Sequence, residues 1–385
     1  MTGVAISGAG IISSIGDNCN ETWQSLLAGK NGAGKVKKFS NTPLKEIYAC
    51  EIENVDVLVN EDKEMGSATN LFYKTAKQAL SDASLGFREP MKVGLSIGTT
   101  MGEIDSLESE LFNKEESNVI GGPNVIADKV YHKLRLNGPK WTITNACAAG
   151  NIAISRAMED ILRGNADVMI AGGVDILSWV AFSGFNSLRA LSPKLCTPFD
   201  RNRKGLLLGE GAGVLILESL EHLKKRKKGK RAVLYGYGLS SDGHHITQPD
   251  LKGDGAVKAM KDAIKMGNIT ENDIEYVNAH GTGTLANDQM ENISINRVFN
   301  SSHPYVSSIK GHLGHTLGAA SAIEAAVCVK ILENGVIPHT QNLKEIDPKF
   351  SINLVKDNPI SSDIKYVLSN SYAFGGVNSS ILIGR

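Results

Sequence analysis

One cysteine of the chain lies where a predicted strand gives way to a predicted helix. In the run Trp141–Gly150, residues that favour strands are followed by small residues around Cys147. From Ala148 onward apolar residues recur at helical spacing, and Gly164 ends the pattern. Cys147 is therefore expected at a helix N-terminus, where free N–H groups and the helix dipole favour a thiolate. The alternative is an inert buried cysteine, which is the commoner state of a lone intracellular thiol.

Three short runs in the second part of the chain carry further groups that could take part in catalysis. His280 follows a predicted strand in the small-residue loop 278–284. Lys310 and His315 stand five residues apart, just before an alanine-rich helix. A glycine-rich turn, 369–378, lies between two predicted strands near the end of the chain. Each run alone has a purely structural alternative, but their combination with a cysteine nucleophile is much more specific.

Alternating strands and helices must position these runs. Buried strands alternating with helices predict a mixed or parallel sheet that is covered on both faces. The basic segment Lys224–Arg231 divides the chain, and the strand and glycine turn after it faintly repeat those of Val4–Gly16. Strands are predicted at 4–12, 92–100, 141–144, 166–173, 211–218, 232–239 and 276–279, and helices at 21–29, 66–83, 123–136, 148–163, 255–266, 288–299 and 317–334.

Composition limits the classes of function. The 385 residues include 41 basic and 41 acidic side chains, so no overall field attracts nucleic acid or a membrane surface. The five cysteines are scattered without a C-x-x-C pair, which supports neither a disulfide framework nor a zinc site. A signal peptide and an apolar run of membrane-spanning length are both lacking. We therefore expect a cytoplasmic protein with no membrane span and no nucleic-acid partner.

The glycine turn after the first strand superficially suggests a dinucleotide site. Ser13 occupies the third glycine position of that fingerprint, and no acidic residue ends a second strand at the required distance. A nucleotide cofactor is therefore not expected.

Taken together, these runs resemble the elongating β-ketoacyl-[acyl carrier protein] synthases, the decarboxylating condensing enzymes of fatty-acid and polyketide synthesis. The similarity covers essentially the whole chain. The resemblance implies an α/β thiolase fold, with two pseudo-repeated halves in a five-layer α-β-α-β-α arrangement. Residues 1–225 would hold the nucleophile, and residues 226–385 would hold the His, Lys, His and Phe-Gly-Gly motifs. The motifs that carry it are 145–150 (Asn-Ala-Cys-Ala-Ala-Gly), 198–205, 209–213, 241–247, 280–284 (His-Gly-Thr-Gly-Thr), 310–315 and 374–376 (Phe-Gly-Gly).

The resemblance also implies a role for each site residue. Cys147 would carry the acyl chain, and its backbone N–H and that of Phe374 would form an oxyanion hole. His280 and His315 would stabilise the enolate that malonyl decarboxylation leaves, while Lys310 would order the site. The supporting assignments are Glu291 as the ion-pair partner of Lys310, Thr282 and Thr284 along the pantetheine arm, and Phe374 with Gly375 at the gate of the acyl pocket.

Partners follow from the same resemblance. Substrates would arrive on the phosphopantetheine of an acyl carrier protein, with no metal and no resident cofactor. Arg201, Arg203 and Lys204 are the expected docking cations for that acidic carrier. The enzyme would form a homodimer, or a heterodimer with a chain-length-factor-like paralogue.

Three alternatives remain to be weighed. A thiolase-type acyltransferase would need a second cysteine within 369–378, which contains none. A non-elongating binding subunit, like a chain-length factor, would lack the nucleophile that this chain keeps. An unrelated Cys-His hydrolase would not explain two histidines, Lys310 and Phe374 together. Tyr372 and Ala373 depart from the Phe-Gly that is commoner in this family. The sequence fits both a fatty-acid pathway and an aryl-polyene or polyketide pathway, and it mildly favours the second.

Overall fold

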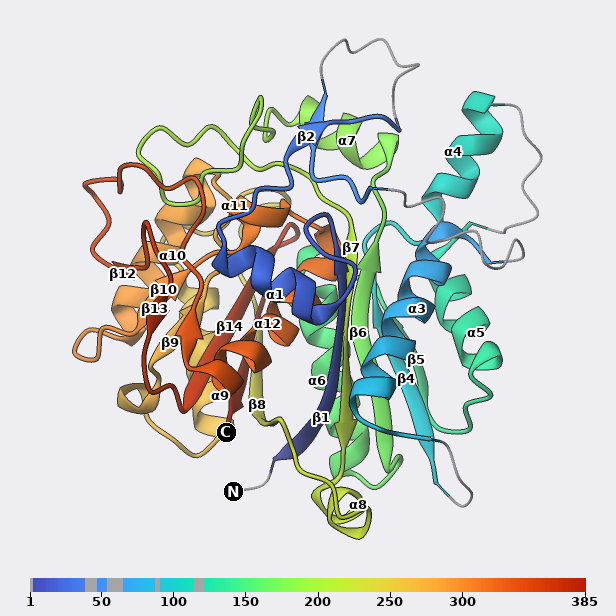
Figure 1. Ribbon diagram of the computed structural model, residues 1–385. Helices are drawn as coiled ribbons and strands as arrows, with labels where there is room; N and C mark the ends of the chain where they lie inside the picture. Colours follow the sequence, from blue (N-terminus) through green and yellow to red (C-terminus); the bar gives the residue numbers. More distant parts are fainter. Residues whose placement is uncertain (1–2, 39–46, 54–64, 87–90, 114–120) are drawn as a thin grey trace.

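Two five-stranded halves are joined edge to edge in one eleven-stranded sheet, whose remaining strand lies at the outer edge of the second half (Figure 1). The computed structural model describes residues 3–38, 47–53, 65–86, 91–113 and 121–385. Ten consecutive buried residues form the first strand, as is typical of a sheet covered on both faces. In spatial order the strands are β12 (Asn353–Leu354), β10 (Tyr305–Ser307), β9 (Tyr276–Asn278), β14 (Tyr366–Ala373), β15 (Val377–Gly384), β8 (Ala232–Ser241), β1 (Val4–Ser13), β7 (Gly211–Glu218), β6 (Val168–Asp175), β4 (Val93–Gly98) and β5 (Lys140–Ile143).

The two halves repeat each other strand by strand. The order β5-β4-β6-β7-β1 in the first half corresponds to β10-β9-β14-β15-β8 in the second. In each half the first three strands of this order pair in parallel, and the remaining pairings are antiparallel. The halves meet where Val4–Ile6 pairs with Ala232–Leu234. The pseudo-repeat is confirmed, while the boundary between residues 225 and 226 stays a prediction.

Helices form three layers around the sheet halves. The helices α3 (Ser67–Asp82) and α5 (Pro123–Lys133) cover the outer face of the first half. On the opposite side, α9 (Asp254–Met266) covers β8 and β15, and α10 (Leu285–Val298) packs on α9. The helices α6 (Ala149–Leu162) and α12 (Ala320–Asn334) lie between the halves and contact strands of both (Figure 1). The predicted five-layer thiolase arrangement is thus the observed one.

The remaining elements surround these layers. They are α1 (Cys19–Leu27), β2 (Gly34–Lys35), β3 (Tyr48–Ala49), α4 (Ile104–Asn113), η1 (Ala146–Ala148), α7 (Trp179–Ser187), α8 (Leu220–Lys225), η2 (Glu271–Asp273), α11 (Lys310–Leu313), η3 (Leu317–Ala319), β11 (Val336–Ile337) and β13 (Ile360–Ser361). Among the residues that the structure describes, no helix is long and apolar enough to cross a membrane.

Small residues let the two central helices pack closely. A Cβ on Gly150 of α6 would lie 2.8 Å from the backbone nitrogen of Ala322 in α12, so no larger residue fits there. Most of α12 is buried on every side, as expected for a helix with sheets on both faces. This contact brings the N-termini of α6 and α12 together, and the functional groups of both halves gather there.

Candidate active site

Cys147 lies in the turn that links strand β5 to helix α6. The short helix η1 precedes α6, and its first residue, Ala146, has a left-handed φ of 45°. Cys147 is only 6% exposed. A Cβ on Gly98 of β4 would overlap the backbone of Ala149, so this strand supports the start of α6 directly. The predicted strand, sharp turn and helix are confirmed around the cysteine.

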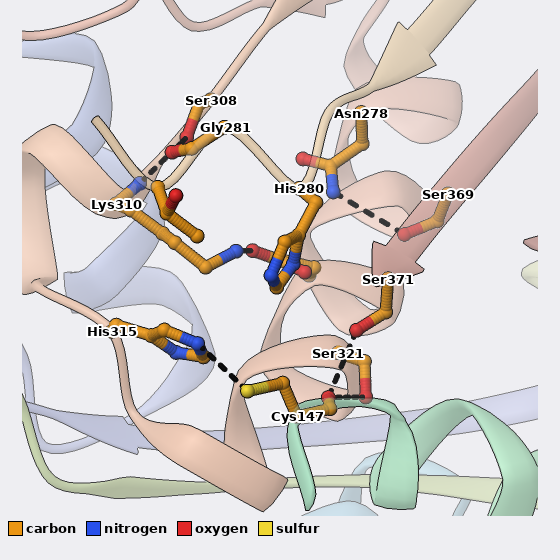
Figure 2. A network of polar contacts seen from close by, with 12 residues as sticks. Cys147, Asn278, His280, Gly281, Ser308, Lys310, His315, Ser321, Ser369 and Ser371 are labelled. Carbon is orange, nitrogen blue, oxygen red and sulfur yellow. Dashed lines mark hydrogen bonds and ion pairs between the residues drawn. The ribbon is translucent and has the colours of Figure 1, made fainter. Parts of the chain in front are cut away.

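The second half presents His315 to the cysteine from the equivalent place. The short helix η3 precedes α12, and its first residue, Leu317, is also left-handed, with a φ of 52°. His315 Nε2 lies 3.0 Å from Cys147 Sγ (Figure 2). The pseudo-repeat therefore places the entrances to the two central helices face to face, with a thiol on one and an imidazole on the other.

The backbone fixes which nitrogen of His315 carries the proton. The N–H of Leu317 donates to His315 Nδ1 at 3.2 Å, so Nδ1 must be unprotonated. In the neutral ring the proton is then on Nε2, which faces Cys147. Burial and the Lys310 ammonium hold the pKa of His315 well below its usual value. His315 is therefore a neutral hydrogen-bond donor toward the sulfur and toward anything bound beside it.

His280 stands edge-on to His315 at the same cavity. Their ring centroids are 5.3 Å apart, with an interplanar angle of 84°. Burial first, and then Lys310 and His315, hold the pKa of His280 well below its usual value. The ring also contacts Tyr372 edge-on, at 5.9 Å between centroids. His280 Nδ1 and the Tyr372 hydroxyl are both buried without a hydrogen-bond partner among the described residues.

The prediction that Lys310 pairs with Glu291 is wrong. Lys310 Nζ instead forms a buried ion pair with Glu324 Oε1 of helix α12. Glu291 accepts hydrogen bonds from the backbone N–H groups of His280 and Gly281, both at 2.7 Å. It thus holds the histidine loop by its backbone. An ammonium can pair with any carboxylate that its long side chain reaches, so the chain order of the motifs did not identify the partner.

The electrostatics of Cys147 differ from the simple expectation of a thiolate at a helix N-terminus. Burial raises the pKa of the Cys147 thiol to about 12, and the nearby Lys310 ammonium acts in the opposite direction. The resting group is thus a thiol at neutral pH, despite its place at the start of α6. The Nε2–H of His315 and the ammonium favour the thiolate whenever it forms during reaction.

Two serines hold the cysteine backbone in place. The Ser371 hydroxyl donates to the Cys147 carbonyl at 2.9 Å, and the Ser321 hydroxyl donates to it at 3.3 Å. Figure 2 shows both side chains converging on that oxygen, one from β14 and one from α12. These serines were not predicted. Their residue type is too common to single them out in the sequence.

A cavity of about 270 Å³ joins the nucleophile to the predicted binding residues. Thr282 and Thr284 line it, and their hydroxyl oxygens are 2.9 Å apart. Phe374 also lines the cavity, and its ring lies 5.5 Å from that of Phe185. Gly375 follows with a φ of 87°, which lets the chain turn directly after the aromatic side chain. The oxyanion-hole and gate roles stay predictions, with their residues beside the nucleophile as required.

The three predicted docking cations have different surroundings, and one of them is wrongly assigned. Arg203 is only 6% exposed and pairs with Asp288 and Asp347, so it cannot serve as a free surface cation. Arg201 is exposed and pairs with Glu345. Lys204 is exposed and lines the mouth of the cavity. The residue types of the run 198–205 did not reveal that Arg203 turns inward to two carboxylates.

Cys147, His280 and His315 are residue types that can ligate a metal ion. The nearest ligand atoms of Cys147, His280 and His315 all lie within 4.8 Å of one another. However, His315 presents a protonated nitrogen to the sulfur, and the Lys310 ammonium is close enough to lower the pKa of both histidines. Those features favour an anionic reaction centre over a bound cation. The expectation of no metal stays a prediction.

Glu324 is the functional residue that sequence reasoning missed most clearly. It is the acidic residue in the apolar run 320–332 of helix α12. Burial raises its pKa to about 7, and the Lys310 ammonium opposes that rise. A lone carboxylate in an apolar helix must be paired or protonated, so this position was a recognisable signal.

Comparisons with known proteins agree with this geometry. The family models described as "Beta-ketoacyl synthase, N-terminal domain" and "Beta-ketoacyl synthase, C-terminal domain" match residues 1–222 and 231–344. Nodulation protein E of Rhizobium meliloti (strain 1021) is 35% identical over 402 residues, covering 98% of this chain and 97% of the relative. The 3-oxoacyl-[acyl-carrier-protein] synthase 2 of Coxiella burnetii is 33% identical over 411 residues, covering 99% and 98%.

Solved structures are similar over the same extent. The ishigamide ketosynthase/chain length factor matches with a TM-score of 0.92 and 33% identity, covering 99% of this chain and 98% of that chain. A second solved structure is described as a type II PKS acyl-carrier protein in complex with its ketosynthase bound to the hexaketide. It matches with a TM-score of 0.90 and 28% identity, covering 99% of this chain and 98% of that chain.

Removing the Lys310 ammonium should make Cys147 less reactive. The ammonium lowers the pKa of the thiol, so Lys310→Met should raise that pKa and shrink the thiolate fraction at any pH below it. Alkylation by iodoacetamide at fixed pH should slow about tenfold for each pKa unit. The double variant Lys310→Met/Glu324→Gln avoids leaving a buried unpaired carboxylate. Lys258→Met, an exposed cation on α9, serves as the control. The double variant also loses the opposing effect of Glu324, so its alkylation rate should lie between those of Lys310→Met and the wild type. A wild-type alkylation rate in folded Lys310→Met would contradict this account.

Proposed function

The chain belongs to the beta-ketoacyl synthase family, and from this premise we propose how its own residues carry out the reaction. It is a condensing enzyme of the β-ketoacyl-[acyl-carrier-protein] synthase type, an acyltransferase that elongates chains in fatty-acid or polyketide biosynthesis. The observation that carries the mechanism is the Cys147–His315 contact of 3.0 Å, with the proton on the histidine nitrogen.

Acylation of Cys147 comes first. The sulfur attacks the thioester carbonyl of an acyl chain on the carrier's phosphopantetheine, and the bond from that carbonyl to the carrier sulfur breaks. The thiol proton of Cys147 ends on the departing carrier thiol, so the transfer is balanced without an external acid. The backbone N–H groups of Cys147 and Phe374 stabilise the oxyanion of the tetrahedral intermediate.

Decarboxylation of the malonyl carrier follows. The bond to the carboxylate breaks, CO2 leaves, and the electron pair remains as a thioester enolate. His280 and His315 donate hydrogen bonds to the enolate oxygen. Both rings stay neutral because burial and Lys310 keep their pKa values low, so they act as donors without giving up a proton. The enolate carbon attacks the acyl–Cys147 carbonyl, and the Cys147 thiolate leaves from a chain that is two carbons longer.

No resident cofactor enters this scheme. The thioester carbonyl of the malonyl group itself accepts the electron pair, and the two neutral imidazoles supply the stabilising hydrogen bonds. We therefore propose that phosphopantetheine, brought by the carrier, is the prosthetic group that the site handles. Thr282 and Thr284, side by side in the cavity, are suited to hydrogen-bond the amides of that arm.

We propose a place on the fold for a partner subunit. Strand β5, which leads directly to Cys147, ends the sheet with one edge unpaired among the described residues. Trp141 on this strand is 38% exposed, although its Nε1–H donates to Asp160 and its ring lies against Arg156. Such an edge readily pairs with another strand. We propose that a second ketosynthase-like chain, a paralogue without the nucleophile, pairs here in a dedicated polyketide or aryl-polyene pathway.

Two variants separate the half-reactions. Cys147→Ala should abolish acylation yet still release CO2 from malonyl-carrier, because both histidine donors remain. His280→Ala should keep acylation and lose decarboxylation by on the order of 10²–10³ in rate, the usual cost of one oxyanion donor. Intact-protein mass and CO2 release should be measured for both variants. Acylation of Cys147→Ala, or wild-type CO2 release by His280→Ala, would refute the assigned roles.

Native mass spectrometry tests the proposed assembly. This chain should be co-expressed with a paralogue that is encoded by a neighbouring gene and lacks the nucleophilic cysteine. The two chains should form a one-to-one complex that carries the elongating activity. Trp141→Lys should weaken the complex, because it places a second cation beside Lys140 on the pairing edge. A fully active homodimer that ignores every such paralogue would instead favour fatty-acid synthesis.

A further inference from the structure

Two cationic side chains, Arg189 and Lys204, lie at the mouth of the active-site cavity. Arg189 and Lys204 are exposed and line the cavity whose inner end is formed by Cys147. Neither forms an ion pair with a carboxylate of the described residues. Their neighbours behave differently, since Arg201 pairs with Glu345 and Arg203 pairs with Asp288.

Backbone hydrogen bonds fix the segments that carry Arg189 and Lys204 relative to each other. The N–H of Leu206 donates to the carbonyl of Ala190 at 2.9 Å, which joins the segments that carry Lys204 and Arg189. The N–H of Gly205 donates to the carbonyl of Gly283 at 3.1 Å. The pair is therefore tied to the loop that contains Thr282 and Thr284, the residues assigned to the pantetheine arm.

Arg189 occupies a backbone position that favours glycine. It follows the C-cap of α7 with a φ of 54°, in the left-handed region. The N–H of Ala190 donates to the carbonyl of Phe185 at 3.1 Å, and the N–H of Arg189 donates to that of Asn186 at 2.9 Å. This is the Schellman pattern, in which the left-handed residue is usually glycine. Arg135 after α5 and Lys227 after α8 take the same left-handed position, so this strain alone assigns Arg189 no function.

The charged side chains that line the cavity are two cations and one carboxylate, so its wall is net positive. Asp242 is the carboxylate that lines it, and both of its oxygens are already used. Oδ1 accepts from Asn378 Nδ2 at 2.7 Å, and Oδ2 accepts from the N–H of Asp250 at 3.0 Å. The cavity therefore has a nucleophile at its inner end and a pair of free cations at its mouth.

We propose that Arg189 and Lys204 form the binding site for the phosphodiester of the phosphopantetheine arm. This inference rests on the proposed function. That arm carries its thioester at one end and its negative charge at the other, which matches the two ends of the cavity. Arginine offers a planar fork of N–H donors to phosphate oxygens, and lysine adds a point charge. The two cations could instead bind acidic side chains on the surface of the carrier protein. The experiment below distinguishes those carboxylates from the phosphate of the arm.

The test uses substrates without any carrier protein. Acylation of Cys147 should be measured with an acyl-phosphopantetheine thioester and with the same acyl-pantetheine, which lacks the phosphate. Wild-type enzyme should prefer the phosphorylated substrate in kcat/KM by on the order of tenfold, since a hydrogen bond to a charged group is worth about that factor. In Arg189→Gln/Lys204→Gln the ratio of the two kcat/KM values should fall to about one, whatever the absolute rates. Lys258→Gln, a distant exposed cation, should keep the preference.

Thermal unfolding supplies an independent readout. Arg189→Gly should raise the unfolding midpoint, because glycine relieves the left-handed strain, while it lowers the preference for phosphate. A purely structural arginine would give a lower midpoint and an unchanged preference. An undiminished preference in the double variant would overturn the phosphate site, as would a loss seen only with carrier-bound substrate. Absence of acylation with both small substrates in wild-type enzyme would instead count against the proposed function itself.

Discussion

The hydrogen bond between His315 and Cys147 is the contact on which the arrangement of the whole molecule depends. It links the N-termini of α6 and α12, which belong to different halves of the chain and occupy equivalent places in them. The small residues at the helix contact and the glycines of the supporting strands allow this approach. The backbone N–H of Leu317 then sets the direction of the hydrogen bond by occupying the other ring nitrogen.

Burial is the second constraint, and it has opposite effects on the groups of the site. It raises the pKa of the Cys147 thiol and lowers those of His280 and His315, so all three rest uncharged. Lys310 and Glu324 bring a compensated charge pair into the same buried region. A neutral donor pair near an ammonium is well suited to stabilise an enolate that forms only transiently. The same low-dielectric surroundings favour loss of CO2 from a carboxylate, because its hydration is withdrawn.

Local pattern and motif order predicted most of the fold and the residues nearest the chemistry. Strand β1, helices α3 and α9, and the turn around Cys147 follow from hydrophobic periodicity and glycine placement. Helices α4 and α7 were not predicted; α7, with Phe182 and Gly184, has a weak helical pattern. Ion pairs between distant segments could not be predicted from the sequence. Lys310 pairs with Glu324 instead of Glu291, and Arg203 turns inward to Asp288 and Asp347, because the fold brings these segments together.

The most direct test of the central claim is a complete reaction with carrier-bound substrates. Purified enzyme should receive one acyl-carrier and malonyl-carrier, with carrier-bound product followed by mass spectrometry and CO2 measured in the same sample. Decarboxylative condensation at Cys147 predicts a β-ketoacyl product two carbons longer than the starting chain, with one CO2 released for each product. Release of the free acid, or a lengthened chain without matching CO2, would contradict the assignment.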